Sequence, residues 1–235
     1  PGHHLRLFGG LVEVFSRHDQ APEQAEMVAR ALPSILATPL GGVTPEDPGP
    51  ALKDLPWRDT LREMAFDIPV RGGIQAVLGP GSLVGRKAIR ETFLAAGDQD
   101  PVLRAFLPRL DALDFQAFHG YLTGGIDLVY RWRPPGAPEP LWWIADYKSN
   151  RLCGRDEAET LSRYGDEAMR QAMVEHLYVL QYHLYLVALH RFLRWRLPGY
   201  DYDRHVGGVR YLFLRGMAGP EHAGRWGVFR DRPPK

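Results

Sequence analysis

The sequence predicts an α/β fold, and three observations lead to it. Segments rich in aromatic and β-branched residues occur at 120–132, 141–149 and 207–216, each next to Gly or Pro. Before and between them, apolar residues recur at the three- and four-residue spacing of amphipathic helices. A length of 235 residues, with 45% hydrophobic and 24% charged residues, suits one sizeable core, so we expect a single domain over residues 1–235.

The first half of the chain alternates helical and extended patterns. We expect helices over 5–15 and 22–36, the second with Pro22 in its first turn, and then an exposed loop over 38–50. A strand over 63–70 and a hairpin of short strands over 74–85 follow, and the pattern over 88–110 is helical or mixed.

The second half holds the longest periodic segment, 166–197, which we predict as one helix that ends before Pro198 and Gly199. Its apolar stripe consists of Met169, Met173, Leu177, Leu180, Leu184, Ala188 and Phe192.

Charge is unevenly distributed along the chain. The net charge is only +1, yet the segment from Leu186 onward contains ten basic residues and only four acidic ones. A basic end suits a phosphate backbone, and a solvated helix face with an Arg-rich tail explains the same pattern equally well.

Composition also bears on the cellular compartment. Cys153 is the single cysteine, which excludes internal disulfides and indicates a reducing environment. Because the chain has no run of about 18 uncharged apolar residues, we expect a cytoplasmic protein without a membrane span.

An aspartate and a lysine close the strand at 141–149. Side chains of a strand alternate in direction, so Asp146 and Lys148 share one face while Tyr147 points away. If the Pro-rich loop before this strand turns about Gly136 and Ala137, Asp127 lies directly across from Asp146, with Cβ atoms about 4.5–5.5 Å apart.

Two carboxylates at that separation repel each other unless a cation lies between them. Hard oxygen ligands suit Mg²⁺, which takes one or two carboxylates together with water and phosphate. Lys148 would add a positive donor beside such a metal. In the alternative interpretation, Asp146 and Lys148 are only the solvated end of a strand, and Asp127 is an unrelated hairpin residue.

Four motifs point to a known family. "GGIDLVYRW", "WWIADYKSN", "LQYHLYLVALHRFLR" and "YDYDRHVGGVRYLFLRG" resemble the nuclease domain of RecB-type exodeoxyribonuclease V beta subunits, within the PD-(D/E)XK superfamily. The resemblance is dense over 115–235, the expected catalytic core, and loose over the helical N-terminal half, residues 1–114. It implies a restriction-endonuclease-like core, a mixed sheet flanked by helices, with Mg²⁺-dependent DNA cleavage. It also implies that the chain is a piece of a longer helicase–nuclease.

The resemblance assigns roles residue by residue. Asp127 and Asp146 match the metal-binding aspartates, Lys148 matches the catalytic lysine, and the Tyr147 backbone carbonyl would complete the metal site. Gln181 and Tyr185 match residues near the DNA. Tyr178, Gln181 and Tyr185 would form one stripe of a helix, although ordinary helix packing explains this stripe as well.

The implied cofactor is Mg²⁺, with Mn²⁺ as a substitute and Ca²⁺ as a non-productive ion. The implied partners are DNA, mainly single strands, the RecC and RecD subunits and a RecA-type recombinase.

One position departs from the family. The first helix of these nucleases carries a metal-binding histidine, and an ungapped match places Leu5 there, with His4 one position away. Either a one-residue shift makes His4 a ligand, or the site lacks a ligand and catalysis is weakened. The sequence therefore leaves three functions open: an active metal-dependent deoxyribonuclease, a weakened nuclease fold that binds DNA or a recombination partner, and a related nuclease outside the recombination complex.

Overall fold

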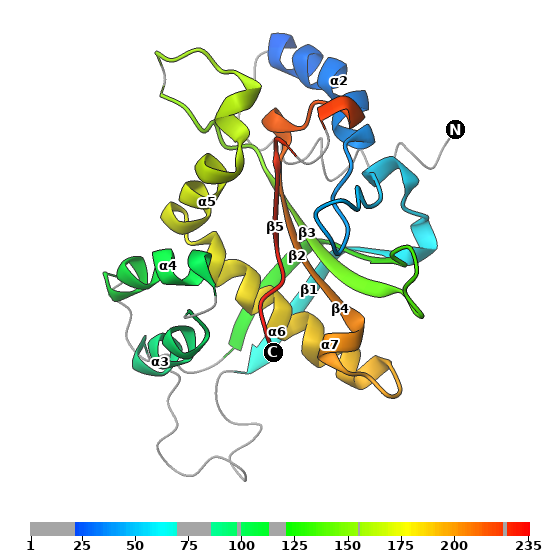
Figure 1. Cartoon of the computed structure of the whole chain (residues 1–235), viewed down its shortest axis with the longest axis vertical. Coiled ribbons are helices and arrows are strands. Elements are labelled where there is room, and N and C mark those ends of the chain that lie inside the picture. The colour runs from blue at the N-terminus through cyan, green and yellow to red at the C-terminus, as the bar shows by residue number, and fades with distance from the viewer. Residues whose placement is uncertain (1–21, 70–85, 98–99, 113–120, 155, 223–224) are drawn as a thin grey trace.

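A five-stranded mixed sheet lies at the centre of the protein (Figure 1). The computed structural model describes residues 22–69, 86–97, 100–112, 121–154, 156–222 and 225–235. Within them, the strands neighbour one another in chain order: β1 (Thr60–Pro69), β2 (Tyr121–Trp132), β3 (Leu141–Lys148), β4 (Val206–Phe213) and β5 (Val228–Asp231). All neighbours are antiparallel except β3 and β4, which are parallel. The predicted mixed sheet flanked by helices is confirmed.

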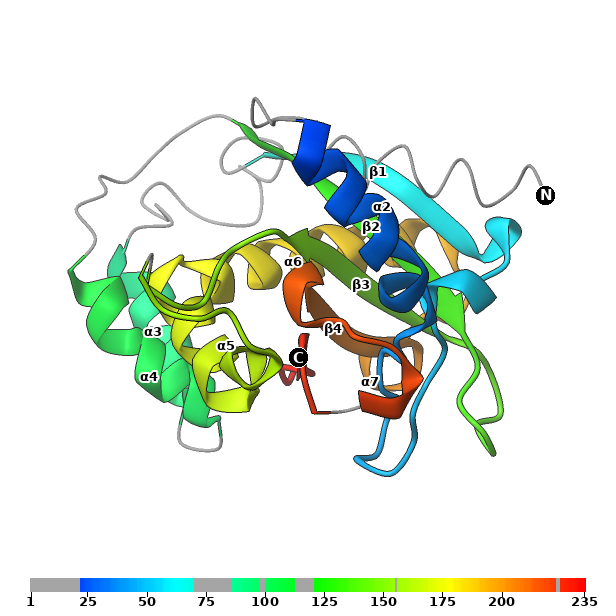
Figure 2. The ribbon, with the colours of Figure 1, turned by 90° about the horizontal axis from the view of Figure 1, so that it is seen from above.

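Helices cover one face of this sheet. They are α3 (Arg86–Gly97), α4 (Pro101–Asp111), α5 (Asp166–Glu175) and α6 (Tyr178–Arg196), and α5 with α6 forms the crossover that parallel strands require. Figure 2 shows α3, α4 and α5 gathered beside one end of the sheet. Their buried residues join Val129, Ile144 and Tyr211 of the strands in the larger hydrophobic core. The 88–110 segment is thus two helices, separated where Asp100 accepts hydrogen bonds from the first amides of α4.

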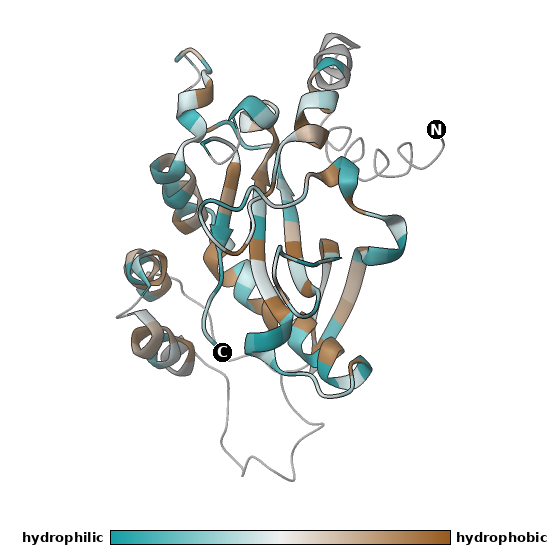
Figure 3. Ribbon diagram, turned by 45° about the vertical axis from the view of Figure 1, so that its right-hand side comes forward, coloured by the Kyte–Doolittle hydropathy of each residue, from teal (hydrophilic) through white to brown (hydrophobic). Residues whose placement is uncertain are grey.

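The opposite face packs against α2 (Pro22–Ala37) and the loop that follows it. Leu40 and Leu52 are fully buried there against Leu128, Trp143 and other strand residues. The exposed loop predicted over 38–50 is therefore wrong at its ends: residues 43–46 are exposed, but Leu40 is buried and a β-bridge joins Pro39 to Ala51. Figure 3 shows hydrophobic residues concentrated along the central strands between these two layers.

The predicted single helix over 166–197 is wrong. The chain leaves α5 after Glu175, and Leu177 adopts a left-handed conformation with φ of 60° before α6 begins. No Gly or Pro marks this break, and the apolar spacing continues across it, so the sequence pattern predicted one helix. The break also turns the buried face, because Val179, Tyr182, Leu186 and Leu189 are buried in α6 while Leu180 and Leu184 of the predicted stripe are half-buried.

Other boundaries follow the sequence with two differences. The strand predicted over 207–216 ends at Phe213 and continues as a short 3₁₀ turn, and β5 was not predicted because only four residues form it. The predicted elements over 5–15 and 74–85, and His4, lie outside the described residues. Among the described helices, none has the length and apolar character to cross a bilayer.

Candidate active site

The register of β2 and β3 brings Asp127 and Asp146 together. Antiparallel partners run from Trp132 with Leu141 to Leu128 with Ala145, which is the register predicted from a turn at Gly136 and Ala137. One residue further along each strand come Asp127 and Asp146. Both side chains share the face of Val129 and Ile144, which is the face covered by α6.

The side chain of Asp127 bonds to the backbone of β3 just beyond the last paired residues of β2 and β3, Leu128 and Ala145. Its Oδ2 accepts a hydrogen bond from the backbone N–H of Tyr147 at 2.9 Å. The side chain is half-buried, and the carboxylate is therefore fixed beside the end of β3, next to Lys148. The backbone N–H of Tyr147, next to Lys148 in the chain, thus donates to a side chain of the neighbouring strand β2.

Asp146 is almost completely buried, with 2% of its surface exposed. Burial raises the pKa of this carboxyl to about 6, the charge of Lys148 opposes that rise, the charge of Asp127 adds to it, and a hydrogen bond from Tyr185 opposes it. The deprotonated carboxylate is thus costly here, and any further positive charge brought beside it would stabilise it.

The ammonium of Lys148 is held from several sides. It lies 2.5 Å from Oδ2 of Asp146 and donates to Oε1 of Gln181 at 3.0 Å. The ring of Tyr178 lies 3.9 Å from the nitrogen, and that of Tyr211 lies 5.0 Å away. Cation–π attraction and the ion pair together fix the position of the ammonium, which is only slightly exposed.

Gln181 and Tyr185 of α6 close a ring of contacts around these charges. The Gln181 side-chain amide donates to the Tyr185 hydroxyl at 2.8 Å, and that hydroxyl hydrogen-bonds Asp146. The same Gln181 oxygen accepts from Tyr211 at 2.9 Å as well as from Lys148. Burial and the charges of the two aspartates raise the pKa of Tyr185, so the phenol stays protonated and remains a donor.

Within the described part of the chain, the side chains predicted for the site therefore meet at one place. Asp127, Asp146 and Lys148 come from β2 and β3, and the α6 stripe of Tyr178, Gln181 and Tyr185 faces them. The sequence analysis did not single out Tyr211, which pairs with Asp146 across the parallel strands. The alternation of "GGVRYLFLRG" could have placed Tyr211 on the same face as the helices, but only the β3–β4 register sets it beside Asp146.

The donor set suits a hard divalent cation. Oδ2 of Asp146 is buried and lies 2.5 Å from the Lys148 ammonium. A buried carboxylate oxygen of this kind is a ready ligand, and Asp127 supplies a second carboxylate. Within the described ranges no group of three or more His, Cys, Asp and Glu side chains could hold a metal. Among the described residues, the two carboxylates would hold a cation here, with backbone, water or phosphate oxygens as further ligands.

Sequence comparison relates the chain to known proteins. The chain is 39% identical over 220 residues to the RecBCD enzyme subunit RecB of Mycobacterium tuberculosis, a match that covers 91% of this chain and 18% of that protein. It is 37% identical over 229 residues to RecB of Mycolicibacterium smegmatis, covering 95% of this chain and 20% of that protein. The chain is homologous to one segment of RecB. With RecB of Escherichia coli the identity is 44% over 144 residues, which are 60% of this chain and 11% of that subunit.

These matches confirm the resemblance to RecB and extend it. The mycobacterial matches cover nearly the whole chain, including the first half, where the sequence analysis found only loose similarity. The chain spans about a fifth of the length of these RecB subunits. No family model matches the chain.

Proposed function

We propose that this chain is a Mg²⁺-dependent deoxyribonuclease module that hydrolyses phosphodiester bonds of DNA. The observation that carries the proposal is the buried Asp146–Lys148 pair, with 2.5 Å between carboxylate and ammonium, whose carboxyl pKa burial and the charge of Asp127 raise. Similarity to RecB, named as a subunit of the RecBCD enzyme, supports the same conclusion independently.

The proposed roles follow from the contacts. Asp127 and Asp146 would hold the cation, with the Tyr147 carbonyl and His4 as further ligands. When bound, Mg²⁺ would polarise the scissile phosphate and lower the pKa of a bound water. Lys148 would place its ammonium against the charge that grows on the phosphate oxygens as water attacks phosphorus and the P–O bond breaks. Gln181 holds that ammonium in place, and Tyr185 keeps Asp146 oriented.

We further propose that the chain works within a RecBCD-like assembly in double-strand-break repair and recombination. The partners would be DNA, mainly as single strands, counterparts of RecC and RecD, and a RecA-type recombinase. We expect the strand to be held by electrostatic contacts to its phosphates, which carry no sequence information. Because such contacts are screened by ions, binding should weaken strongly with salt.

Metal uptake and cleavage test the proposal separately. Isothermal calorimetry of the 235-residue chain with MgCl₂ should show binding that Asp146→Asn and Asp127→Asn each weaken at least tenfold, and Mg²⁺ should raise the melting temperature of the unaltered chain. Mn²⁺ should replace Mg²⁺ in cleavage, and Ca²⁺ should bind without supporting it.

End-labelled single-stranded DNA then reports on cleavage. The unaltered chain should degrade it with Mg²⁺, and Lys148→Met should not, while Lys53→Met on an exposed 3₁₀ turn serves as the matched lysine control. DNA binding without cleavage by the unaltered chain would instead favour the weakened nuclease fold that acts as a binding module. Unchanged cleavage in Lys148→Met would remove the proposed function.

A further inference from the structure

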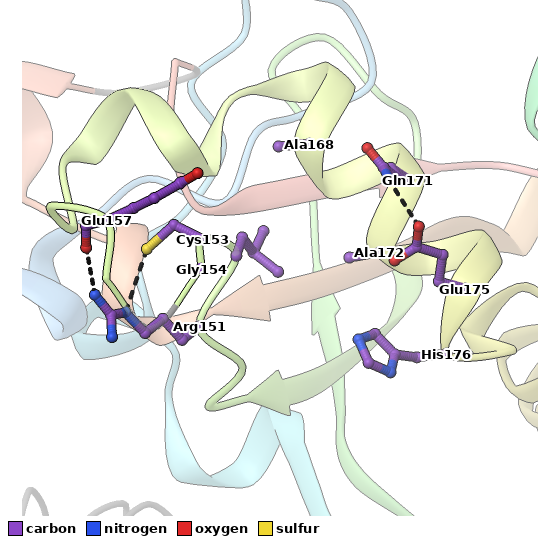
Figure 4. A pocket seen from close by; sticks show the side chains of 10 residues that line it. Arg151, Cys153, Gly154, Glu157, Ala168, Gln171, Ala172, Glu175 and His176 are labelled. Carbon is purple, nitrogen blue, oxygen red and sulfur yellow. Dashed lines mark hydrogen bonds between the residues drawn. The ribbon is translucent and has the colours of Figure 1, made fainter.

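A cavity of about 340 Å³ opens next to the candidate active site, between the loop after β3 and helix α5 (Figure 4). Residues 151–154 and Glu157 of the loop form one wall. Gln171, Ala172, Glu175 and His176, at the end of α5, form the other. Figure 4 shows the side chains of Gln171, Glu175 and His176 on the α5 side, across from Arg151 and Cys153.

The cavity is connected to Lys148 through one shared side chain. The His176 ring stacks on Tyr178 at 5.3 Å between centroids, and the same Tyr178 ring lies 3.9 Å from the Lys148 nitrogen. Asn150 strengthens this wall, because its side chain accepts from the Tyr178 hydroxyl at 3.0 Å and approaches His176 Nε2 at 3.5 Å. His176 of the cavity lining and Lys148 of the candidate active site therefore contact the same Tyr178 ring.

The charge of the lining disfavours a phosphate. Arg151 is the one cation among the lining residues, and its guanidinium is engaged by the Glu157 carbonyl at 2.6 Å and the Cys153 sulfur at 3.2 Å. Two carboxylates, Glu157 and Glu175, also line the space, and although Arg163 pairs with Glu157 at 3.1 Å, Glu175 would repel an anion. Arg151 shapes the loop rather than receiving a ligand.

The same lining favours a flat group that donates hydrogen bonds. Leu152 and Ala172 give the cavity apolar surface, and the exposed His176 ring offers a stacking face. Glu175 is exposed and oriented by the Gln171 side-chain amide, which donates to its Oε1 at 2.7 Å. Carboxylates accept hydrogen bonds from exocyclic amino groups of bases, and unpaired bases stack on aromatic rings that include histidine.

We propose that this cavity binds an unpaired nucleobase with an exocyclic amino group, supplied by the single strand that lies at Asp146 and Lys148. His176 is the stacking surface and Glu175 the hydrogen-bond acceptor. The inference rests on the proposed function, since it takes the DNA strand as the ligand, and it adds a base preference that phosphate contacts alone cannot give.

Binding measured without cleavage tests this proposal first. Fluorescence anisotropy with oligo-dC, oligo-dA and oligo-dT, in Ca²⁺ buffer, should show weaker binding of oligo-dT, whose base has no exocyclic amino group. Glu175→Ala should remove the difference between oligo-dC and oligo-dT, and His176→Ala should weaken all three about tenfold. Glu167→Ala is the matched control, because Glu167 is an exposed acid of α5 outside the cavity.

The position of cuts provides the second measurement. On mixed-sequence single strands with Mg²⁺, the unaltered chain should cut at positions fixed relative to C, A or G rather than T, and Glu175→Ala should flatten this distribution several-fold. Free dCMP should not compete with the strand at concentrations near the affinity of the oligonucleotide; effective competition would reassign the cavity to a free nucleotide and overturn the proposal.

The two proposals fail in different ways. Equal affinity for oligo-dC and oligo-dT that Glu175→Ala leaves unchanged overturns the base site, even if the chain cuts DNA. Base-dependent binding without any cleavage leaves the base site standing and removes the nuclease activity. Absence of any strand binding overturns both.

Discussion

Two buried cations on neighbouring strands, Lys148 of β3 and Arg210 of β4, have opposite surroundings. Lys148 faces the helices, next to a buried carboxylate, two tyrosine rings and one amide oxygen. Arg210 faces the other side of the sheet and is directed at backbone carbonyls of Gly41, Gly42 and Val209, above the ring of Trp143. Exposed fractions are similar, 9% for Lys148 and 3% for Arg210.

The difference lies in the kind of acceptor that each cation contacts. The guanidinium directs its donors to neutral acceptors that close the loop after α2 over the sheet, and burial lowers the pKa of Arg210 to about 10 without removing its charge at neutral pH. Lys148, by contrast, meets the buried carboxylate of Asp146 at 2.5 Å, and burial raises the pKa of that acid to about 6. Arg210 is expected to stabilise the fold, and the surroundings of Lys148 are expected to serve chemistry at some cost in stability.

The largest expected effect is on catalysis at Lys148. Lys148→Met keeps most of the side-chain volume and removes the charge, so the rate of single-strand cleavage with Mg²⁺ should fall about 10³-fold. Single-turnover rates measure this loss, and Lys53→Met should keep the original rate. A fall of less than tenfold would mean that Lys148 belongs with Arg210 as a structural cation.

Arg210→Met should mainly reduce stability. Three carbonyl oxygens would lose their donors in a buried environment, and we expect the free energy of unfolding to fall by about 3 kcal/mol. Urea unfolding followed by tryptophan fluorescence measures it, with the exposed Arg133→Met as control. At a temperature where the variant is folded, its cleavage rate should remain within about threefold of the original.

The pH dependence of stability should report on Asp146. Because its pKa is raised to about 6 in the folded protein from 3.8, the folded state binds more protons than the unfolded state between these values. Without divalent cations, the contribution of Asp146 to stability should therefore decrease by roughly 2–3 kcal/mol as pH rises from about 4 to about 6, and stay constant above.

Burial raises the pKa of Asp231 to about 6 as well, so both acids contribute to the decrease. Asp146→Asn should flatten the curve partially and Asp231→Asn should flatten the remainder, as measured by urea unfolding at a series of pH values. An unchanged slope in Asp146→Asn would show that the Lys148 charge fully compensates the burial of this carboxylate.

The smallest effect is expected at Tyr178. Tyr178→Leu removes the ring next to the ammonium and should lower the cleavage rate about tenfold, the size of one cation–π contact in a largely buried site. Tyr178→Phe keeps the ring and loses only the hydrogen bond to Asn150, so it should restore most of the rate. Equal losses in both variants would assign the effect to Asn150 and the loop rather than to the ring.

The sequence by itself determined β2, β3 and the pairing of the two acids. Alternating aromatic and β-branched residues mark β2 and β3, and the Pro-rich turn between them fixes a register that a local loop can set. This is why Asp127 and Asp146 could be paired in advance, together with the α6 stripe of Tyr178, Gln181 and Tyr185, whose spacing is a property of one helix.

Only the tertiary structure decided the break at Leu177, the burial of Leu40 and the place of Tyr211 beside Asp146. Each depends on a contact between segments far apart in the chain. The break at Leu177 belongs to the crossover that packs α6 on the sheet, and Leu40 belongs to a loop whose carbonyl groups accept hydrogen bonds from Arg210. Tyr211 lies beside Asp146 because β3 pairs in parallel with β4 across 57 intervening residues. Local propensity carries no information about such contacts, because their energy comes from burial against residues that the segment does not itself contain.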